Sequence, residues 1–452
     1  MMRRASAALA VTVTMLAVGA APAGAIPPPQ VDPATPTPNG SAGPIGALAQ
    51  RNPCVTSTAI PGTEPFASDV NASALNLSQA WTHSRGEGQT VAVLDTGVRP
   101  GPRLPDVEAG GDYVASGDGL TDCDGHGTLV AGLIAGQPGA DGFSGVAPDA
   151  RILSIRVASP RYAPRDGGED PALTRAALDT QAMAAAIVRA ADQGARVISI
   201  SAVTCVPVGK NFDQDGLGAA LRYAAVDKDV VIVAAAGDNG PACESNPPSD
   251  PALPADPRNW SGVSAVSIPA WWHEYVLSVG SLGSDGRPSS FTMAGPWVGI
   301  AAPGENITSV SNDDTGGLAN GLPAEQDRID PVRGTGYATA YVAGVAALVR
   351  SRFPELPARQ VIERLTGTAQ SAARSPSNLV GAGRVDPVAA LTWNVPDTND
   401  IDPAAVKPIA APPPPPPHDP VPRAVAFTGA GVLALVVLAV AVSSARRKET
   451  SS

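Results

Sequence analysis

The sequence predicts an α/β protein built on a doubly wound parallel sheet with helices on both faces. Short apolar runs with strand character alternate with helical stretches from Thr90 onward, which is the pattern of a parallel sheet covered on both sides. Runs such as 230–234 are apolar at every position, as expected for strands buried on both faces. In a sheet of this kind, reactive groups lie at the carboxyl ends of the strands.

The elements follow one another along the chain with few ambiguous segments. Strands are expected at 90–94, 152–157, 197–200 and 230–234, with weaker signals at 276–279 and 297–301. Helices are expected at 173–193 (ended by Gly194), 217–226, 337–353 and 357–366. The segments 159–171, 243–269 and 311–333 exceed ordinary loop lengths, so we expect them to be functional or partner-binding loops.

The N-terminal region is predicted to be an export signal followed by an extended arm. Arg3 and Arg4 precede an apolar run from residue 5 to 21, and Ala23-Gly24-Ala25 resembles a cleavage site, so residues 1–25 are predicted to be a secretory signal peptide. An uncleaved anchor helix is the alternative. Residues 26–70 are rich in Pro, Ser, Thr and Gly and are predicted to form an extended arm without a core of its own.

The C-terminal region is predicted to be a membrane anchor that follows a spacer. Residues 424–442 carry no charge and, as a helix, would span roughly 28 Å. The basic residues 446–448 follow, so the tail 443–452 is predicted to be cytoplasmic and the domain 71–395 extracytoplasmic, tethered to the plasma membrane by one pass. The linker 396–423 contains Pro412–Pro417, which favours a polyproline II spacer, with an aromatic-groove docking motif as the alternative.

Charge and cysteine usage exclude several classes of function. The formal net charge is −11, and an acidic chain lacks the clustered basic residues that nucleic-acid binding needs. Four Cys allow three pairings. No C-x-x-C spacing or calcium-type loop is present, so two disulfides are expected, with no metal and no cofactor.

Three separated segments carry the candidate chemistry. Asp95 ends the first strand, His126 lies in a Gly turn that runs into a helix, and Gly334-Thr335-Gly336 opens the helix at 337–353. Each is weak alone, because Asp-Thr-Gly also occurs in aspartic proteases and a His between glycines is often a turn residue. In this order they match the Asp, His, nucleophile arrangement, in which the carboxylate orients the imidazole and the imidazole activates a hydroxyl.

These segments resemble the subtilisin-like serine proteases, and the whole chain resembles the mycosins, which are membrane-anchored members associated with type VII secretion. The supporting segments are Asp95-Thr96-Gly97, His126-Gly127-Thr128, 231–237, 256–260, 269–272 and 341–344. The resemblance implies a subtilisin-like fold, disulfides Cys54–Cys123 and Cys205–Cys243, a peptide cleft rimmed by 199–202, and a type VII secretion membrane complex as partner.

The sequence departs from the family at three positions of the chemical centre. Gly336 stands where the family has the nucleophilic serine, and Ala340 stands at the family's proline position. The amide that completes the family's oxyanion hole is replaced by Asp238, with Asn239 next in the chain; an ionised Asp238 would repel an oxyanion.

The sequence therefore predicts a catalytically impaired mycosin with a structural or peptide-binding role in the secretion complex. The alternative is an active serine endopeptidase that processes secreted proteins and uses another nucleophile. Thr335 and Thr339 are the nearest hydroxyls in sequence, but the first belongs to the family motif and is expected to point elsewhere. An adhesive surface protein without a secretion partner is a third hypothesis.

Overall fold

A computed structural model describes most of the chain. The described residues are 26–63, 70–166, 168–210, 212–240, 243–250, 252, 255–324, 326, 328–371, 376–395 and 421–449. The predicted signal peptide and the linker up to residue 420 lie outside them. The chain divides into two units, one ending at Val395 and one beginning at Pro396.

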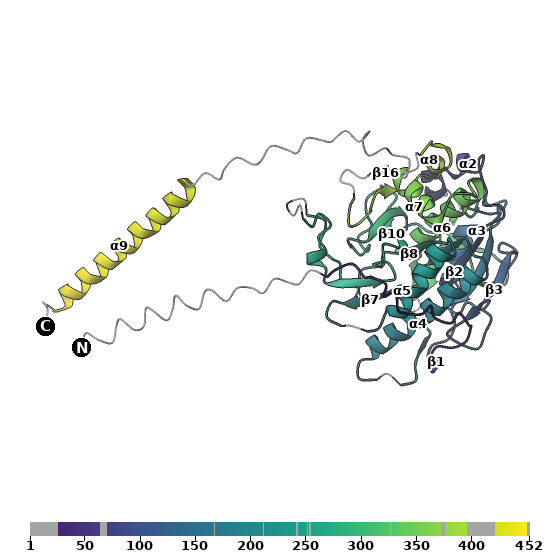
Figure 1. Cartoon of the computed structure of the whole chain (residues 1–452), viewed down its shortest axis with the longest axis horizontal. Coiled ribbons are helices and arrows are strands. Elements are labelled where there is room, and N and C mark those ends of the chain that lie inside the picture. Colours follow the sequence, from purple (N-terminus) through teal and green to yellow (C-terminus); the bar gives the residue numbers. More distant parts are fainter. Residues whose placement is uncertain are drawn as a thin grey trace. The chain divides into compact units, whose positions relative to one another are not determined.

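A nine-stranded sheet forms the centre of the first unit (Figure 1). Its strands lie in the order β16-β17-β11-β10-β8-β6-β2-β4-β3. Neighbouring strands pair parallel, apart from β16 and β17, which are antiparallel. The strands are β2 (Thr90–Asp95), β3 (Val107–Asp112), β4 (Arg151–Arg156), β6 (Val197–Ile200), β8 (Val231–Ala235), β10 (Val276–Leu282), β11 (Val298–Pro303), β16 (Gln370–Ser371) and β17 (Gly383–Arg384).

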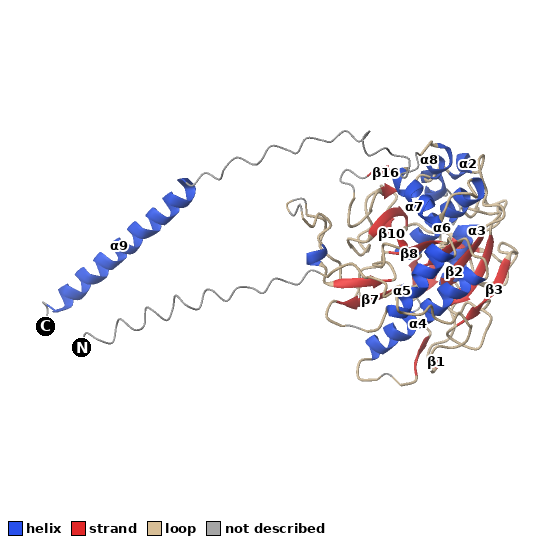
Figure 2. Cartoon of the chain, in the orientation of Figure 1, coloured by secondary structure: helices blue, strands red, loops and turns tan. Residues whose placement is uncertain are grey.

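Helices cover both faces of this sheet (Figure 2). Val91 and Val93 of β2 join one apolar cluster with α3 and α6, whereas Ala92 and Leu94 join a second cluster with α4 and α5. This alternation follows from the two-residue period of a strand. The helices are α1 (Val70–Ala74), α2 (Leu77–Ala80), α3 (His126–Ala135), α4 (Pro171–Asp192), α5 (Asp215–Arg222), α6 (Thr335–Arg352), α7 (Ala358–Gly367) and α8 (Pro387–Thr392).

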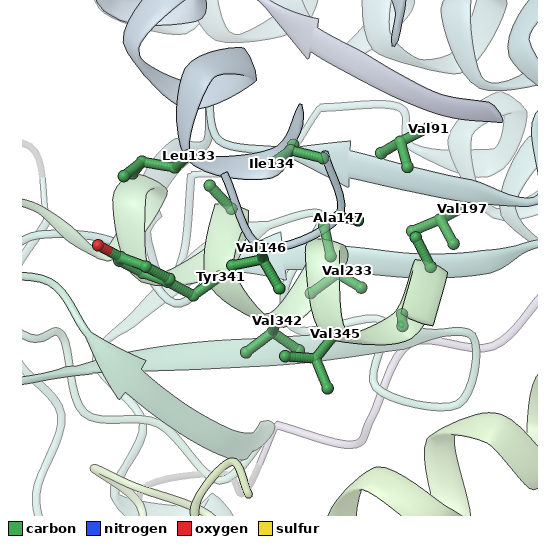
Figure 3. Packing of buried hydrophobic residues seen from close by; sticks show 14 of the residues in the cluster. Val91, Leu133, Ile134, Val146, Ala147, Val197, Val233, Tyr341, Val342 and Val345 are labelled. Atoms are coloured by element: carbon green, nitrogen blue, oxygen red, sulfur yellow. The ribbon is translucent and has the colours of Figure 1, made fainter. Parts of the chain in front are cut away.

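Helix α6 is the buried centre of the first cluster. Every residue from Thr335 to Arg350 is buried, and a Cβ added to Gly344 would lie 2.6 Å from the Val146 side chain. Figure 3 shows Tyr341, Val342 and Val345 packed beside Val146. Small residues let the helix approach its neighbours this closely, so packing on all sides holds the N-terminus of α6 in place.

The fold class is confirmed, and the differences from the sequence prediction are local. Strand β3 was not predicted, because its Val-Glu-Ala-Gly-Gly-Asp sequence lacks a strand-like apolar pattern; its pairing with β4 keeps it in the sheet. The predicted helix 217–226 is α5 followed by one π-helical turn, Tyr223–Asp227. The predicted long loops also contain short strands, namely β5 (Tyr162–Pro164), β9 (Ala265–Ile268), β13 (Leu318–Ala319), β14 (Gly321–Pro323) and β15 (Ile329–Pro331), and β12 (Ser309–Val310) lies directly before the last of these loops.

The N-terminal arm is fastened to the domain. Its strand β1 (Leu48–Gln50) pairs antiparallel with β5, and Thr58 exchanges backbone hydrogen bonds with Gly321. The Cys54–Cys123 disulfide joins the arm to the segment that precedes α3. The second disulfide, Cys205–Cys243, ties β7 (Thr204–Pro207) to the loop after β8. Both disulfides are those that the resemblance implied.

The second unit contains one described helix, α9 (Val421–Glu449). Its segment Val425–Ser443 has a mean hydropathy of 2.6 over 19 residues, long and apolar enough to cross a membrane. It contains nearly all of the predicted span 424–442.

Candidate active site

The ends of β2, α3 and α6 meet at one edge of the sheet. Asp95 is the last residue of β2, and His126 is the first residue of α3. His126 Nδ1 lies 2.8 Å from Asp95 Oδ1. Asp95 is fully buried, while the His126 side chain stays 29% exposed, so one edge of the imidazole can be reached from outside.

Local backbone chemistry places His126. Gly125, the residue before the helix, has φ 77°, a left-handed conformation that glycine adopts without a steric penalty. A Cβ on Gly127 would lie 2.1 Å from the Gly97 carbonyl oxygen. The helix and the turn after β2 therefore touch through glycine, which brings Asp95 and His126 together.

Asp122 stabilises this turn. It is not among the site residues that were predicted from the sequence. Its carboxylate accepts five hydrogen bonds, from the Thr96 hydroxyl, the Asp124 and Gly125 N–H groups, and the N–H and hydroxyl of Thr128. Burial raises the pKa of Asp122, and these hydrogen bonds oppose the shift. An Asp placed shortly before a helix start is a capping signal, and that signal was available in the sequence.

The nucleophile position carries no functional group. Gly336 is the second residue of α6, and an added Cβ there would lie 3.4 Å from His126 Nε2 and 3.1 Å from Ser201 Cβ. Position 336 thus has the placement of a nucleophile beside the imidazole. Glycine offers no hydroxyl to activate.

Neighbouring hydroxyls are engaged elsewhere. The Thr335 hydroxyl donates to Asp238 Oδ1 at 2.8 Å and accepts from the Gly237 N–H. The Thr339 hydroxyl donates to the Thr335 carbonyl oxygen. The Ser201 hydroxyl donates to the Gly336 carbonyl oxygen at 3.3 Å. None of the three is hydrogen-bonded to His126.

The oxyanion side of the site is also altered. Asp238 follows β8, and its Oδ1 accepts from the Thr335 N–H at 2.9 Å. The Asn239 amide donates to the carbonyl oxygens of Ser290 and Thr292. Asn239 is therefore turned away from the position where an oxyanion donor is needed, and Asp238 presents an acceptor there.

The surroundings of His126 favour its charged form. Burial lowers the pKa of His126, but the charge and hydrogen bond of Asp95, with the charges of Asp122 and Asp238, outweigh burial and raise it to about 9. The Tyr337 ring lies 4.8 Å from the imidazole, centroid to centroid, within the range of cation–π attraction. The raised pKa favours the protonated imidazole, whereas a general base must be unprotonated.

These groups line one cleft of about 610 Å³. The lining includes Ala158, Pro160 and Arg161, Ser201 to Val203, and Gly334 to Gly336; the arm contributes Val55. Of the predicted rim 199–202, Ser201 and Ala202 line the cleft, whereas Ser199 is buried in β6. The volume of the cleft lies in the range of ligand-binding pockets.

Within the described ranges, no group of three or more His, Cys, Asp or Glu side chains could hold a metal ion. The groups that the site itself presents are the buried Asp95 carboxylate, the His126 imidazole and the first turn of α6.

Comparison with known proteins identifies the architecture. Residues 86–383 match the model of the Subtilase family, peptidase S8. Mycosin-3 of Mycobacterium tuberculosis is 57% identical over 456 residues, covering 99% of both chains. Mycosin-1 of Mycolicibacterium smegmatis is 44% identical over 454 residues, covering 98% of this chain and 99% of that protein.

Solved structures of similar proteins point to the same family as these relatives. The MycP3 protease from the type VII (ESX-3) secretion system is 68% identical and covers 82% of this chain and 100% of its own, with a TM-score of 0.80. A chain in the structure of an intact ESX-5 inner membrane complex is 45% identical and covers 92% of this chain and 99% of its own, also with a TM-score of 0.80.

Proposed function

Because this chain belongs to the mycosins of the subtilase family, we propose that it is a catalytically impaired member with a structural or peptide-binding role in a type VII secretion membrane complex. The observation that carries the proposal is Gly336, which lies beside His126 Nε2 without a side chain. Loss of the nucleophile in subtilisin, a worked case of this chemistry, lowers kcat by about 2 × 10⁶. Residual turnover at that level would not process a secreted protein efficiently.

We also propose a position in the membrane, which the C-terminal helix and the similar structures support. The α9 segment is long enough to span a bilayer, and basic residues 446–448 follow it. A chain similar to this one occurs in the structure of an intact ESX-5 inner membrane complex. Another similar chain occurs in the structure of the periplasmic assembly of that complex. We therefore place the domain outside the plasma membrane, on a single tether after an N-terminal signal peptide.

The retained Asp95–His126 contact favours the second candidate, an active endopeptidase. A 2.8 Å contact of this kind orients a general base. It also fits the impaired protein, because the pair belongs to the polar network that joins β2 to α3.

The test combines a chemical probe with a pull-down. The full chain, in gentle detergent, is treated with a serine-directed phosphonate and with peptide substrates, and its co-purifying membrane proteins are identified. The proposal expects no label, no cleavage and recovery of secretion membrane components. Labelling of the native chain, or cleavage that is lost in His126→Ala, would establish the endopeptidase. Purification free of any secretion component would reject the complex.

A further inference from the structure

A second cavity lies between β7 and the start of α4, outside the cleft described above. Its volume is about 270 Å³. An apolar cavity of about 150 Å³ is large enough to bind benzene, so this one has room for a branched aliphatic or aromatic side chain. Its lining comes mainly from the two elements that flank it, namely Ala172, Leu173 and Ala176 of α4 and Cys205, Val206 and Pro207 of β7.

The Cys205–Cys243 disulfide joins this cavity to the cleft. Cys243 lines the cleft, whereas Cys205 lines the cavity, and their Cα atoms are 5.1 Å apart. On α4, Arg175 lines the cleft and its neighbour Ala176 lines the cavity. Because an extended chain advances about 3.3 Å per residue, a bound segment passes from the cleft to the cavity within about two residues.

The rim of the cleft continues directly into β7. Residues 201–203 line the cleft, and β7 begins at the next residue. The Val208 N–H donates to the Ser264 carbonyl oxygen at 2.8 Å. In the antiparallel register of β7 with β9, hydrogen-bonded and non-hydrogen-bonded positions alternate, so the N–H and C=O of Cys205 point away from β9. They lie on the edge of β7 that has no strand partner in the described part of the chain.

A pair of charged side chains borders the cavity. Lys210 Nζ forms an ion pair with Asp170 Oδ2, and both residues belong to the lining. Asp170 also caps α4, because its Oδ1 accepts from the Leu173 N–H at 3.1 Å. The Lys210 and Asp170 side chains are 55% and 34% exposed, so their charges stay in contact with water. The apolar lining is left for an apolar side chain, as in pockets with few polar groups.

We propose that this cavity is a second binding site for a peptide that lies in the cleft: it takes one branched aliphatic or aromatic side chain, such as that of Leu or Phe, while the peptide backbone pairs with the Cys205 N–H and C=O. In strand addition of this kind, main-chain hydrogen bonds supply affinity and side-chain pockets supply selectivity. The occupant is a peptide, because a free apolar molecule could not use the outward donor and acceptor of Cys205. The proposal rests on the peptide-binding role above and adds selectivity for an apolar residue at one end of the bound segment.

The test uses ¹⁹F NMR with the full chain in detergent. The probe is N-acetyl-4-fluorophenylalanine methylamide, which carries one aromatic side chain and a backbone donor and acceptor. We expect its ¹⁹F signal to shift on binding. N-acetylphenylalanine methylamide should displace it at a concentration about 10- to 100-fold lower than N-acetylalanine methylamide, as burial of one aromatic side chain implies. Extending the probe by pentaalanine on its N-terminal or its C-terminal side should tighten binding in one of the two directions, because that extension lies in the cleft.

Three variants locate the two sites. Ala172→Trp places a large side chain at an exposed position of the cavity lining and should abolish binding of the probe. The matched control is Gln181→Trp, at an exposed position of α4 outside the lining, which should leave binding unchanged. Ala202→Trp obstructs the cleft and should remove the tighter binding of the extended probe.

The proposal would be overturned by equal displacement with the phenylalanine and alanine amides, by probe binding that survives Ala172→Trp, or by extensions that do not tighten binding in either direction. Hexaalanine methylamide, measured by calorimetry, tests the cleft alone. If it binds to the native chain and to Ala172→Trp but not to Ala202→Trp, the peptide-binding role stands even where the cavity fails.

Discussion

Asp238 caps the helix that begins at Thr335: one carboxylate oxygen accepts both the backbone N–H, at 2.9 Å, and the hydroxyl, at 2.8 Å. The N-cap residue itself, Gly334, has no side chain, so the cap comes from the end of β8. A negative charge here also complements the helix dipole. The residue predicted to replace the oxyanion donor thus caps the helix at the centre of the fold.

Removing this cap should lower the free energy of unfolding. We expect Asp238→Ala to reduce the free energy of unfolding by about 0.5–2 kcal/mol, as for other lost helix caps, measured by urea unfolding of the domain 26–395. The matched control is Asp170→Ala, which removes the cap of α4. Of these two variants, only Asp238→Ala should also lower the pKa of His126, because Asp238 raises that pKa and Asp170 does not act on the imidazole. Equal His126 titration in both variants would contradict the assignment.

Restoring the nucleophile should restore only part of the chemistry. Gly336→Ser must displace Ser201 and His126 slightly, since a Cβ contact at 3.1–3.4 Å is tight, and it still lacks an amide donor. We expect it to react with a phosphonate slowly, and Gly336→Ser/Asp238→Asn to react about 10²–10³ times faster, the usual effect of one oxyanion donor. Gly336→Ala, with a Cβ but no hydroxyl, is the control and should not react. No reaction of the double variant would mean that the cleft has lost more than these two groups.

The charge on His126 should make stability depend on pH. The folded pKa of about 9 lies above the ordinary histidine value of 6.5, so the protonated imidazole stabilises the fold. This contribution, about 3 kcal/mol, is fully present below pH 6.5 and is lost as pH rises through 9. Urea unfolding of domain 26–395 between pH 6 and 10 should show this loss, and His126→Gln should abolish it. A native profile that stays flat over this range would refute the charged state.

Asp122 should act as a positioning residue for His126. Asp122→Asn cannot accept all five hydrogen bonds, so the turn before α3 should loosen and the pKa of His126 should fall, as read from its ¹⁵N titration. Asp112→Asn is the matched control, because Asp112 is equally buried and accepts from Val114 and Ala115 N–H groups in another turn. If both variants lose stability and neither moves the His126 titration, Asp122 has only a structural role.

The Cys54–Cys123 disulfide should hold the arm on the domain. It closes a separation of 69 residues, for which loop entropy predicts a loss of about 4 kcal/mol when the bond is removed. We expect Cys54→Ser/Cys123→Ser to speed hydrogen exchange in β1 and at Thr58, which pair with β5 and Gly321. Unchanged exchange in both places would show that pairing alone fastens the arm.

Much of the protein could be predicted from its residues alone. The apolar runs of β2, β6 and β8 predicted the sheet, because strands buried on both faces must be apolar at every position. The sequence also predicted that Asp95, His126 and Gly336 belong to one site, and the structure brings these three positions together; that they form a site without a nucleophile stays a prediction. The edge strand β3 could not be predicted, since pairing with β4 overrides its poor strand sequence.

Only the tertiary structure decided how the altered site is arranged. Sequence order left open whether Asn239 could replace the lost donor, and the structure shows its amide bound to the 290–292 backbone. It also showed Asp238 bound to the N-terminus of α6 and Asp122 bound to the turn that precedes His126. These contacts join residues that are far apart in the chain, and their geometry depends on how the ends of separate strands and helices meet. Residue type determined what this site lacks, and packing determined what its remaining groups can bind.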